Sequence, residues 1–300
     1  MDRSIVEEIR EIKVKRKAVI VAHNYQPPEV QDIADFCGDS LELARLSAKS
    51  DAEVIVFCGV DFMVEMAAIL AEGKIVLNPE PTATCPMANM VTVDDVLKMQ
   101  KENHRAKVVC YVNSTVDVKA VSYTCCTSAN AVKIFQAIKE PLIFVPDRYL
   151  GTYAASVTNR KDVILANGFC PTHMSFKTDD IKAMRKSHPN AFVMVHPECT
   201  PDVTALADGV FSTSGMVRAA KERDEQEFVV GTEIGLLHRL RKENSKKRFY
   251  PLNEKAVCPN MKKMTLEKIR DALLNMSHKT TVPESLAKPA KEALERMLFY

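Results

Sequence analysis

The sequence has no marked excess of either charge, because 41 basic residues are balanced by 39 acidic ones. Binding to nucleic acid or to an anionic bilayer needs a field of one sign, so both functions are disfavoured. The sequence also lacks the run of about 20 apolar residues that a membrane-spanning helix requires. Its first residues, MDRSIVEEIREIKVKRK, are a charged, helix-like segment rather than a secretory signal. We therefore expect a cytoplasmic protein.

The nine cysteines do not form a disulfide framework if the protein is cytoplasmic. Cys58 and Cys110 lie in the apolar runs VIVFCGV and KVVCYV, so we expect them to pack in buried strands. Three others share a different context, since Cys85, Cys170 and Cys258 are each followed by proline and no other cysteine is. They are 85 and 88 residues apart, which suggests a repeat.

Three features precede each of these cysteines in the same order: an apolar run ending in polar residues, a serine that opens a helical stretch, and a second run ending in an acid. Counted back from the cysteine of the same segment, the positions are Asn24, Asn113 and Pro197 at 61, 57 and 61; Ser40, Ser128 and Ser214 at 45, 42 and 44; and Asp61, Asp147 and Glu233 at 24, 23 and 25. The spacing predicts a triplicated unit.

The fold class expected for each unit is α/β with a parallel sheet. Short runs rich in Val, Ile and Phe alternate with amphipathic stretches such as SLELARLSAKS, a pattern typical of parallel strands whose crossover helices cover both faces. We predict units at residues 1–87, 88–173 and 174–260, arranged around a pseudo-threefold axis. A helical extension, 261–300, should pack across the units or cap the cleft between them.

The carboxyl ends of parallel strands gather ligand-binding groups. The tripeptides His23-Asn24-Tyr25, Tyr111-Val112-Asn113 and His196-Pro197-Glu198 are expected at three such ends. With threefold symmetry they converge on one cleft, together with the three Cys-Pro loops.

Three convergent thiolates suit zinc or an iron–sulfur cluster, and three ligands leave one coordination position open, as in a catalytic centre. Zinc sites usually contain a close Cys-x-x-Cys pair, which these cysteines lack, so single ligands from three loops favour a cluster with one exposed iron. His173, three residues after Cys170, would complete a rival Cys3His zinc site. The alternatives are therefore a zinc-dependent lyase or hydrolase and a noncatalytic metal-sensing module.

Several motifs together resemble the quinolinate synthase family over essentially the whole chain. They are HNYQPPEVQDIADFCGDS, YVNS with a later Cys-Thr-Ser-Ala, GFCPTH, HPEC, STSGM and CPNMKKMTLEK. The resemblance implies three α/β domains in a triangle around a [4Fe-4S] cluster. It implies an enzyme of NAD biosynthesis that condenses iminoaspartate with dihydroxyacetone phosphate to quinolinate, releasing phosphate and water. An L-aspartate-oxidising enzyme would supply the iminoaspartate.

The resemblance also implies roles for single residues. Cys85, Cys170 and Cys258 would hold the cluster, whose open iron acts as a Lewis acid. The segment CPNMKKM has no second cysteine, so we do not expect a disulfide switch there. His23 and His196 would bind the substrate carboxylates.

Further contacts follow from the same likeness. Ser40, Ser128 and Thr213 would bind substrate, with Ser214 as the helix cap. Tyr25 and Glu198 would exchange protons with substrate, aided by His196, and desolvation should raise the basicity of Glu198. The remaining predicted substrate contacts are Tyr111, Val112, Asn113, His173 and Pro197. We expect Asp61, Asp147 and Glu233 to be helix caps.

Overall fold

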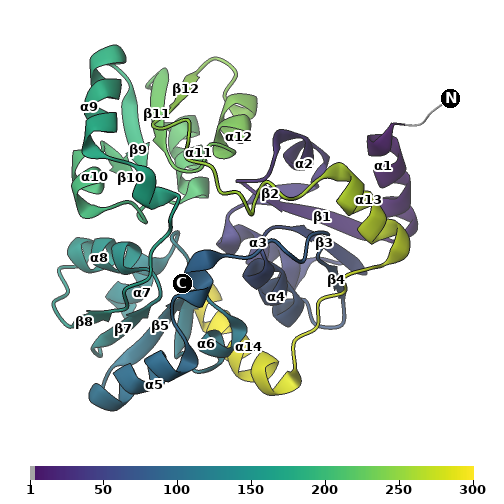
Figure 1. Cartoon of the computed structure of the whole chain (residues 1–300), viewed down its shortest axis with the longest axis horizontal. Helices are drawn as coiled ribbons and strands as arrows, with labels where there is room; N and C mark the ends of the chain where they lie inside the picture. The colour runs from purple at the N-terminus through teal and green to yellow at the C-terminus, as the bar shows by residue number, and fades with distance from the viewer. Residues whose placement is uncertain (1–3) are drawn as a thin grey trace.

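The computed structural model of the chain describes residues 4–300 and is shown in Figure 1. These residues form three four-stranded sheets in which all paired strands run parallel. Each sheet is the centre of one lobe, and the three lobes surround a common point (Figure 1). Residues 1–3 of the charged N-terminal segment and of the first predicted unit lie outside the described part.

The first unit has the strand order β2-β1-β3-β4. Its elements are α1 (Ile5–Lys15), β1 (Ala18–His23), α2 (Pro28–Ile33), β2 (Phe36–Gly38), α3 (Ser40–Lys49), β3 (Val54–Cys58), α4 (Asp61–Leu70), β4 (Ile75–Leu77) and the 3-10 helix η1 (Pro86–Asn89).

The second unit repeats this order as β6-β5-β7-β8. Its elements are α5 (Val93–Glu102), β5 (Lys107–Tyr111), α6 (Val116–Ala120), β6 (Thr124–Cys126), α7 (Ala131–Ala137), β7 (Leu142–Val145), α8 (Arg148–Val157), β8 (Val163–Leu165) and η2 (His173–Ser175).

The third unit has the order β10-β9-β11-β12. Its elements are α9 (Thr178–Ser187), β9 (Phe192–Val195), α10 (Pro201–Leu206), β10 (Gly209–Val210), α11 (Thr213–Glu222), β11 (Glu227–Gly231), α12 (Leu236–Glu243) and β12 (Arg248–Pro251). The predicted triplicated α/β architecture with parallel sheets is confirmed.

Both faces of each sheet are buried, which explains the continuous apolar runs. In β1, Val19 and Val21 belong to the core on the α3 and α4 side, whereas Ile20 and Ala22 belong to the core that includes residues of α1 and α13 (Leu266–Asn275). Successive side chains alternate between faces, so a sheet covered twice needs apolar residues at every position. Cys58 and Cys110 are fully buried in β3 and β5, as predicted.

The C-terminal extension packs across two units, as expected. Its last helix, α14 (Glu284–Leu298), contacts α6 and β6 of the second unit and α4 of the first. The apolar side chains of α14 join one core that runs through both units. In Figure 1 the yellow helix lies beside these two lobes.

The third unit meets the first through polar side chains. Asn24, which follows β1 and is fully buried, donates from Nδ2 to Oγ1 of Thr213 at 2.8 Å. Its Oδ1 accepts a bond from Nη1 of Arg239 at 2.9 Å. The side chain of Asn24 therefore joins the first unit to two helices of the third.

We expect Asn24→Ala to lower the free energy of unfolding by about 1–3 kcal/mol, because it leaves buried polar partners unpaired. Urea unfolding followed by circular dichroism measures the loss. The matched control is Asn244→Ala, whose amide donates only to the carbonyl of Leu240 within the same unit, at 3.0 Å. Equal losses in the two variants would contradict the assignment of Asn24 as an inter-unit link.

Candidate functional site

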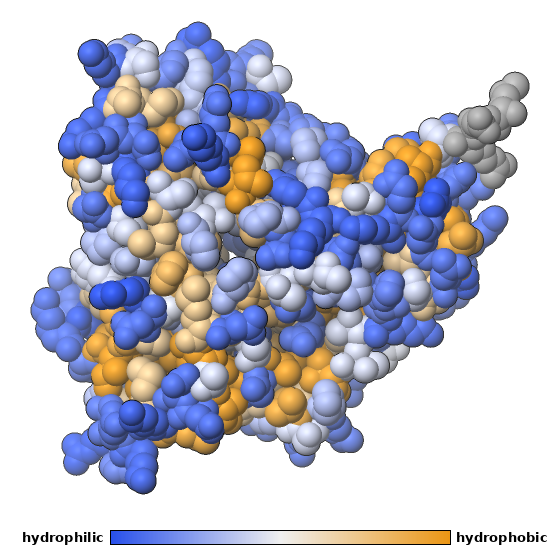
Figure 2. Space-filling view, viewed as in Figure 1, coloured by the Kyte–Doolittle hydropathy of each residue, from blue (hydrophilic) through white to orange (hydrophobic). Residues whose placement is uncertain are grey.

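The carboxyl ends of the three sheets line one central cavity, with an empty volume of about 950 Å³ including its mouth. On the face shown in Figure 2, the surface is recessed where the three lobes meet. The cavity brings together most of the predicted site residues: His23, Tyr25, Ser40, Cys85, Tyr111, Asn113, Ser128, Cys170, His173, His196, Glu198, Thr213 and Cys258.

Two predicted residues do not line this cavity. Val112 is fully buried in the core, and its backbone N–H is bound to the carbonyl of Cys126 at 2.9 Å. Pro197 is buried beside His196 and Glu198 but is not part of the lining. The first and third residues of each tripeptide face the cavity, as expected where a strand ends and side chains alternate.

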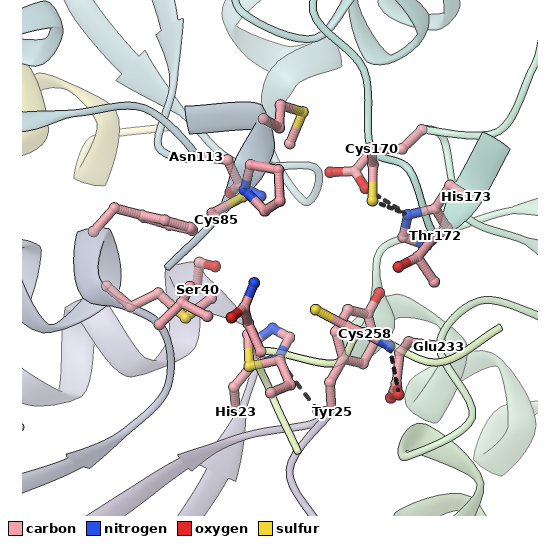
Figure 3. A pocket seen from close by; sticks show the side chains of 18 of the residues that line it. His23, Tyr25, Ser40, Cys85, Asn113, Cys170, Thr172, His173, Glu233 and Cys258 are labelled. Carbon is pink, nitrogen blue, oxygen red and sulfur yellow. Dashed lines mark hydrogen bonds and ion pairs between the residues drawn. The ribbon is translucent and has the colours of Figure 1, made fainter. Parts of the chain in front are cut away.

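The sulfur atoms of Cys85, Cys170 and Cys258 point into the cavity from three sides (Figure 3). Each cysteine opens a Cys-Pro turn, and the backbone N–H three residues later, that of Ala88, His173 or Met261, acts to lower the pKa of its thiol. The proline fixes the φ angle of the residue after each cysteine. All three loops therefore begin with the same constraint.

These N–H groups favour a thiolate, but burial opposes it. Burial raises the pKa of the Cys85 thiol to about 12 and also raises those of Cys170 and Cys258. Three such thiols stay protonated at neutral pH unless a cation binds them, since metal coordination deprotonates a thiol outright. The donor set therefore fits a metal centre bound by thiolates.

His23 and His196 occupy equivalent positions and are held in the same way. Nδ1 of His23 accepts from the backbone N–H of Tyr25 at 3.2 Å, and Nδ1 of His196 accepts from that of Glu198 at 3.4 Å. Burial lowers the pKa of both rings to about 3, so both are neutral at pH 7. With Nδ1 occupied, the proton is on Nε2, where each ring acts as a hydrogen-bond donor.

Glu198 is buried and has partners from two elements, β5 and η2. The phenol of Tyr111 donates to Oε1, and Nδ1 of His173 lies 2.6 Å from Oε2. Burial acts to raise the pKa of Glu198, but His196, His173 and the bonds from His173 and Tyr111 outweigh it and bring the pKa to about 2. The expectation of a raised pKa is wrong, because these partners stabilise the charged form.

Tyr25 lies at the end of the first unit's central strand and reaches the third unit. Its hydroxyl is 2.6 Å from Oγ1 of Thr232, which is in turn 2.9 Å from Nε2 of His173. Burial and the nearby charge of Glu198 raise the pKa of Tyr25 well above its ordinary value, so the phenol keeps its proton. Thr232 was not predicted, and Val60 and Pro146 precede the acid in the other units, so the repeat gave no signal.

Two of the predicted hydroxyls stand at helix starts. Ser40 and Thr213 are the first residues of α3 and α11. The expectation that Ser214 is the cap is wrong, because Ser212 accepts the N–H of Gly215 while Ser214 accepts from the N–H of Asp39 and donates to Glu42. The register of the cap shifts by two residues because Ser214 is used at the contact with the first unit.

Asn113 and Ser128 complete the polar lining from the second unit. Oδ1 of Asn113 is buried without a hydrogen-bond partner in the described residues. Ser128 precedes α7, and its hydroxyl lies 3.2 Å from Nε2 of His196. A buried amide oxygen without a partner is costly, and a ligand N–H or O–H in the cavity would satisfy it.

The three recurring acids are only partly explained as caps. Asp147 accepts the N–H groups of Tyr149 and Leu150 at the start of α8, as predicted. Asp61 is the first residue of α4 rather than its cap, and Glu233 accepts the N–H of Gly235 and pairs with Lys262 at 2.9 Å. Glu233 also lines the cavity, which the prediction of a plain cap missed.

The fold and the site define a class: an α/β enzyme of three repeated units whose cysteine loops meet in one central cavity. The family described as "Quinolinate synthetase A protein" matches residues 7–299. The chain belongs to this quinolinate synthase family, which acts in NAD biosynthesis. In the described part of the chain, no helix has the length and apolar character needed to cross a membrane.

Similar proteins match nearly end to end. The quinolinate synthase of Dehalococcoides mccartyi (strain CBDB1) is 54% identical over 295 residues, covering 98% of this chain and 97% of that protein. The quinolinate synthase of Thermodesulfovibrio yellowstonii is 53% identical over 294 residues, with the same coverage. That of Methanoregula boonei is 53% identical over 293 residues, covering 97% of each chain.

Proposed function

We propose that the chain condenses iminoaspartate with dihydroxyacetone phosphate to quinolinate in the central cavity, with loss of phosphate and water. A [4Fe-4S] cluster would be held by Cys85, Cys170 and Cys258, one ligand from each of the units 1–87, 88–173 and 174–260. The observation that carries the proposal is the set of three Cys-Pro loops whose cysteines all face one cavity.

The donor set fits such a cluster for two reasons. Thiolate ligands are those that iron–sulfur clusters take, and N–H bonds to sulfur are one of the protein's means of tuning them. When bound, a cluster with three protein ligands would supply one Lewis-acidic iron for a substrate oxygen or nitrogen.

Substrate binding would rely on neutral donors and hydroxyls. Iminoaspartate has two carboxylates, and the Nε2–H groups of His23 and His196 can each donate to one of them. The hydroxyls of Ser40 and Thr213 stand at helix starts, where N–H groups and the helix dipole favour anions such as carboxylate or phosphate. The free Oδ1 of Asn113 would accept from a substrate N–H or O–H.

Proton transfer would use Glu198 and Tyr25. Condensation, loss of phosphate and dehydration each move a proton from carbon or to a leaving oxygen. Glu198 is ionised and is oriented by Tyr111 and His173, so it would take the proton. Tyr25 keeps its proton because of its high pKa and would give it to a leaving oxygen, with Thr232 holding its hydroxyl.

The supply of iminoaspartate is the remaining part of the proposal. We propose that the chain works in the cytoplasm beside an enzyme that oxidises L-aspartate and hands over the imine. The test of function therefore generates iminoaspartate in the assay with such an oxidising enzyme.

The experiment combines iron and sulfide analysis of anaerobically prepared protein with an assay for quinolinate from the two substrates. We expect close to four irons and four sulfides per chain and quinolinate formation that depends on both substrates. Iron and sulfide without quinolinate would support the proposed cluster and overturn the proposed reaction.

Zinc analysis on the same sample tests the rival metal. Cys170, His173 and Glu198 each offer a ligand atom, and these atoms lie within 4.8 Å of one another, an arrangement that could hold a single ion. Stoichiometric zinc with no sulfide would favour that centre and overturn the cluster.

A further inference from the structure

The acids Asp61, Asp147 and Glu233 recur next to the three cysteine loops. Each acid follows the third strand of its unit (β3, β7 or β11), while each cysteine loop follows the fourth (β4, β8 or β12). These two strands are paired in parallel in every sheet, so the acid and the loop follow neighbouring carboxyl ends of the sheet. The arrangement occurs three times in one chain.

A backbone hydrogen bond ties each loop to the acid-bearing segment, donated by the acid itself in the first unit and by the residue after the acid in the other two. The N–H of Asp61 donates to the carbonyl of Ala83 at 2.8 Å, that of Arg148 to Gly168 at 2.9 Å, and that of Ile234 to Ala256 at 3.1 Å. Each acceptor is the carbonyl two residues before a cysteine. Each loop is therefore fixed to the neighbouring segment two residues before its cysteine.

In Asp147 and Glu233, the two carboxylate oxygens have different surroundings. In Asp147, Oδ1 takes both N–H bonds from the start of α8, at 2.9 and 2.7 Å, and Oδ2 is left buried without a partner at hydrogen-bond distance. In Glu233, Oε2 accepts from Gly235 at 2.7 Å and Oε1 accepts from the backbone N–H of Cys258 at 3.2 Å. Figure 3 draws the bond between Glu233 and Cys258.

Asp61 and Asp147 lie beside the corresponding cysteine loops. Burial raises the pKa of both carboxyls, and the backbone N–H of Cys85 acts in the opposite direction on Asp61, as that of Cys170 does on Asp147. Oδ1 of Asp61 accepts the N–H of Phe62 at 2.8 Å. In each unit, one oxygen thus holds the start of a helix beside a cysteine loop, and in the third unit the carboxylate of Glu233 also accepts the N–H of the cysteine.

We propose that Asp61, Asp147 and Glu233 are positioning residues that brace the three cysteine loops and so set how tightly the protein keeps its cluster. The inference rests on the proposed function, because it assumes that the cysteines hold a cluster. A braced loop has already lost the freedom that cluster binding would otherwise cost. Partners of this outer kind typically change metal affinity by about 10- to 100-fold.

The sharpest variants are Asp147→Asn and Glu233→Gln. In Asp147→Asn, the amide oxygen can still cap α8, but an NH2 group then replaces the buried Oδ2 beside the loop of Cys170. Turning the amide over would restore an oxygen there but break both cap bonds. In Glu233→Gln, one oxygen cannot serve both Gly235 and Cys258. Each change keeps the size of the side chain.

Matched controls lie at the amino ends of strands in the same sheets. Asp162→Asn alters an acid that precedes β8 and pairs with Arg160, and Glu227→Gln alters the first residue of β11, which pairs with Arg248. Both controls remove one carboxylate without touching a cysteine loop.

The measurement is the rate at which anaerobically reconstituted protein loses iron to a chelator, followed by visible absorbance, with the unfolding temperature of the cluster-free protein recorded beside it. We expect about 10- to 100-fold faster loss in Asp147→Asn and Glu233→Gln, and wild-type rates in the controls. Wild-type rates in both test variants would overturn the inference, and so would faster loss matched by the controls. If one variant fails to fold, the other decides. Absence of iron from the wild-type protein would instead overturn the proposed cluster.

Discussion

We expect Cys85→Ala to lose both bound iron and quinolinate formation while the chain stays folded. Cys85 supplies one of only three thiols in the cavity and comes from the loop after β4. Its side chain is half-buried and packs against the core from the cavity wall, so its loss costs less packing than that of a fully buried cysteine. A centre with two remaining thiols cannot be held.

The expected size of the effect follows from the chemistry. A Lewis-acidic metal contributes several kcal/mol to the stabilisation of developing charge. Since each 1.36 kcal/mol is a factor of ten, we expect activity to fall by about a thousandfold or more. Iron and sulfide analysis, the visible spectrum and the quinolinate assay measure the loss, and far-ultraviolet circular dichroism checks the fold.

The matched control is Cys58→Ala in the same unit. Cys58 is fully buried in β3 and does not line the cavity. This variant removes an equally large thiol, so we expect normal iron content and activity with some loss of stability. Full activity in an iron-free Cys85→Ala protein, or equal loss of iron in both variants, would contradict the assignment.

Repetition made much of the fold and site predictable. A single Cys-Pro or a single strand-end histidine carries little information, but Cys85, Cys170 and Cys258 share a spacing that only a repeated unit produces. Once the strands are parallel and the units equivalent, the strand ends must share one side of each sheet. His23 and His196 therefore fall in equivalent places, down to the same N–H bond on Nδ1.

What could not be predicted depends on contacts between units. Thr232 has no counterpart in the other repeats, yet it holds both Tyr25 and His173. The pKa of Glu198 is set by Tyr111, His173 and His196, which come from two units, so its place at an apolar strand end suggested the wrong direction. Tertiary neighbours, rather than local sequence, decide such properties.

Glu198→Gln is the second change with a large expected effect. The substitution keeps the shape of the side chain and its acceptor for Tyr111 but removes the charged group that would take the proton. General base catalysis contributes about 10²- to 10⁴-fold, so we expect kcat to fall by that range while KM changes little. Iron content should stay normal, which separates this effect from loss of the cluster. Glu227→Gln, at the far end of β11, serves as the control and should keep wild-type kcat.

A double variant tests whether Glu198 and Tyr25 act together. If one takes the proton that the reaction must release and the other returns a proton to the leaving oxygen, removing either blocks the same overall sequence. Residues that act as a unit have effects that are far from additive. We therefore expect Tyr25→Phe with Glu198→Gln to be little slower than the slower single variant, measured as kcat on iron-loaded protein. Strictly multiplicative losses would show that the two residues contribute independently of each other. A kcat within about threefold of wild type in Glu198→Gln would remove Glu198 from proton transfer, since that is far below the usual contribution of a general base.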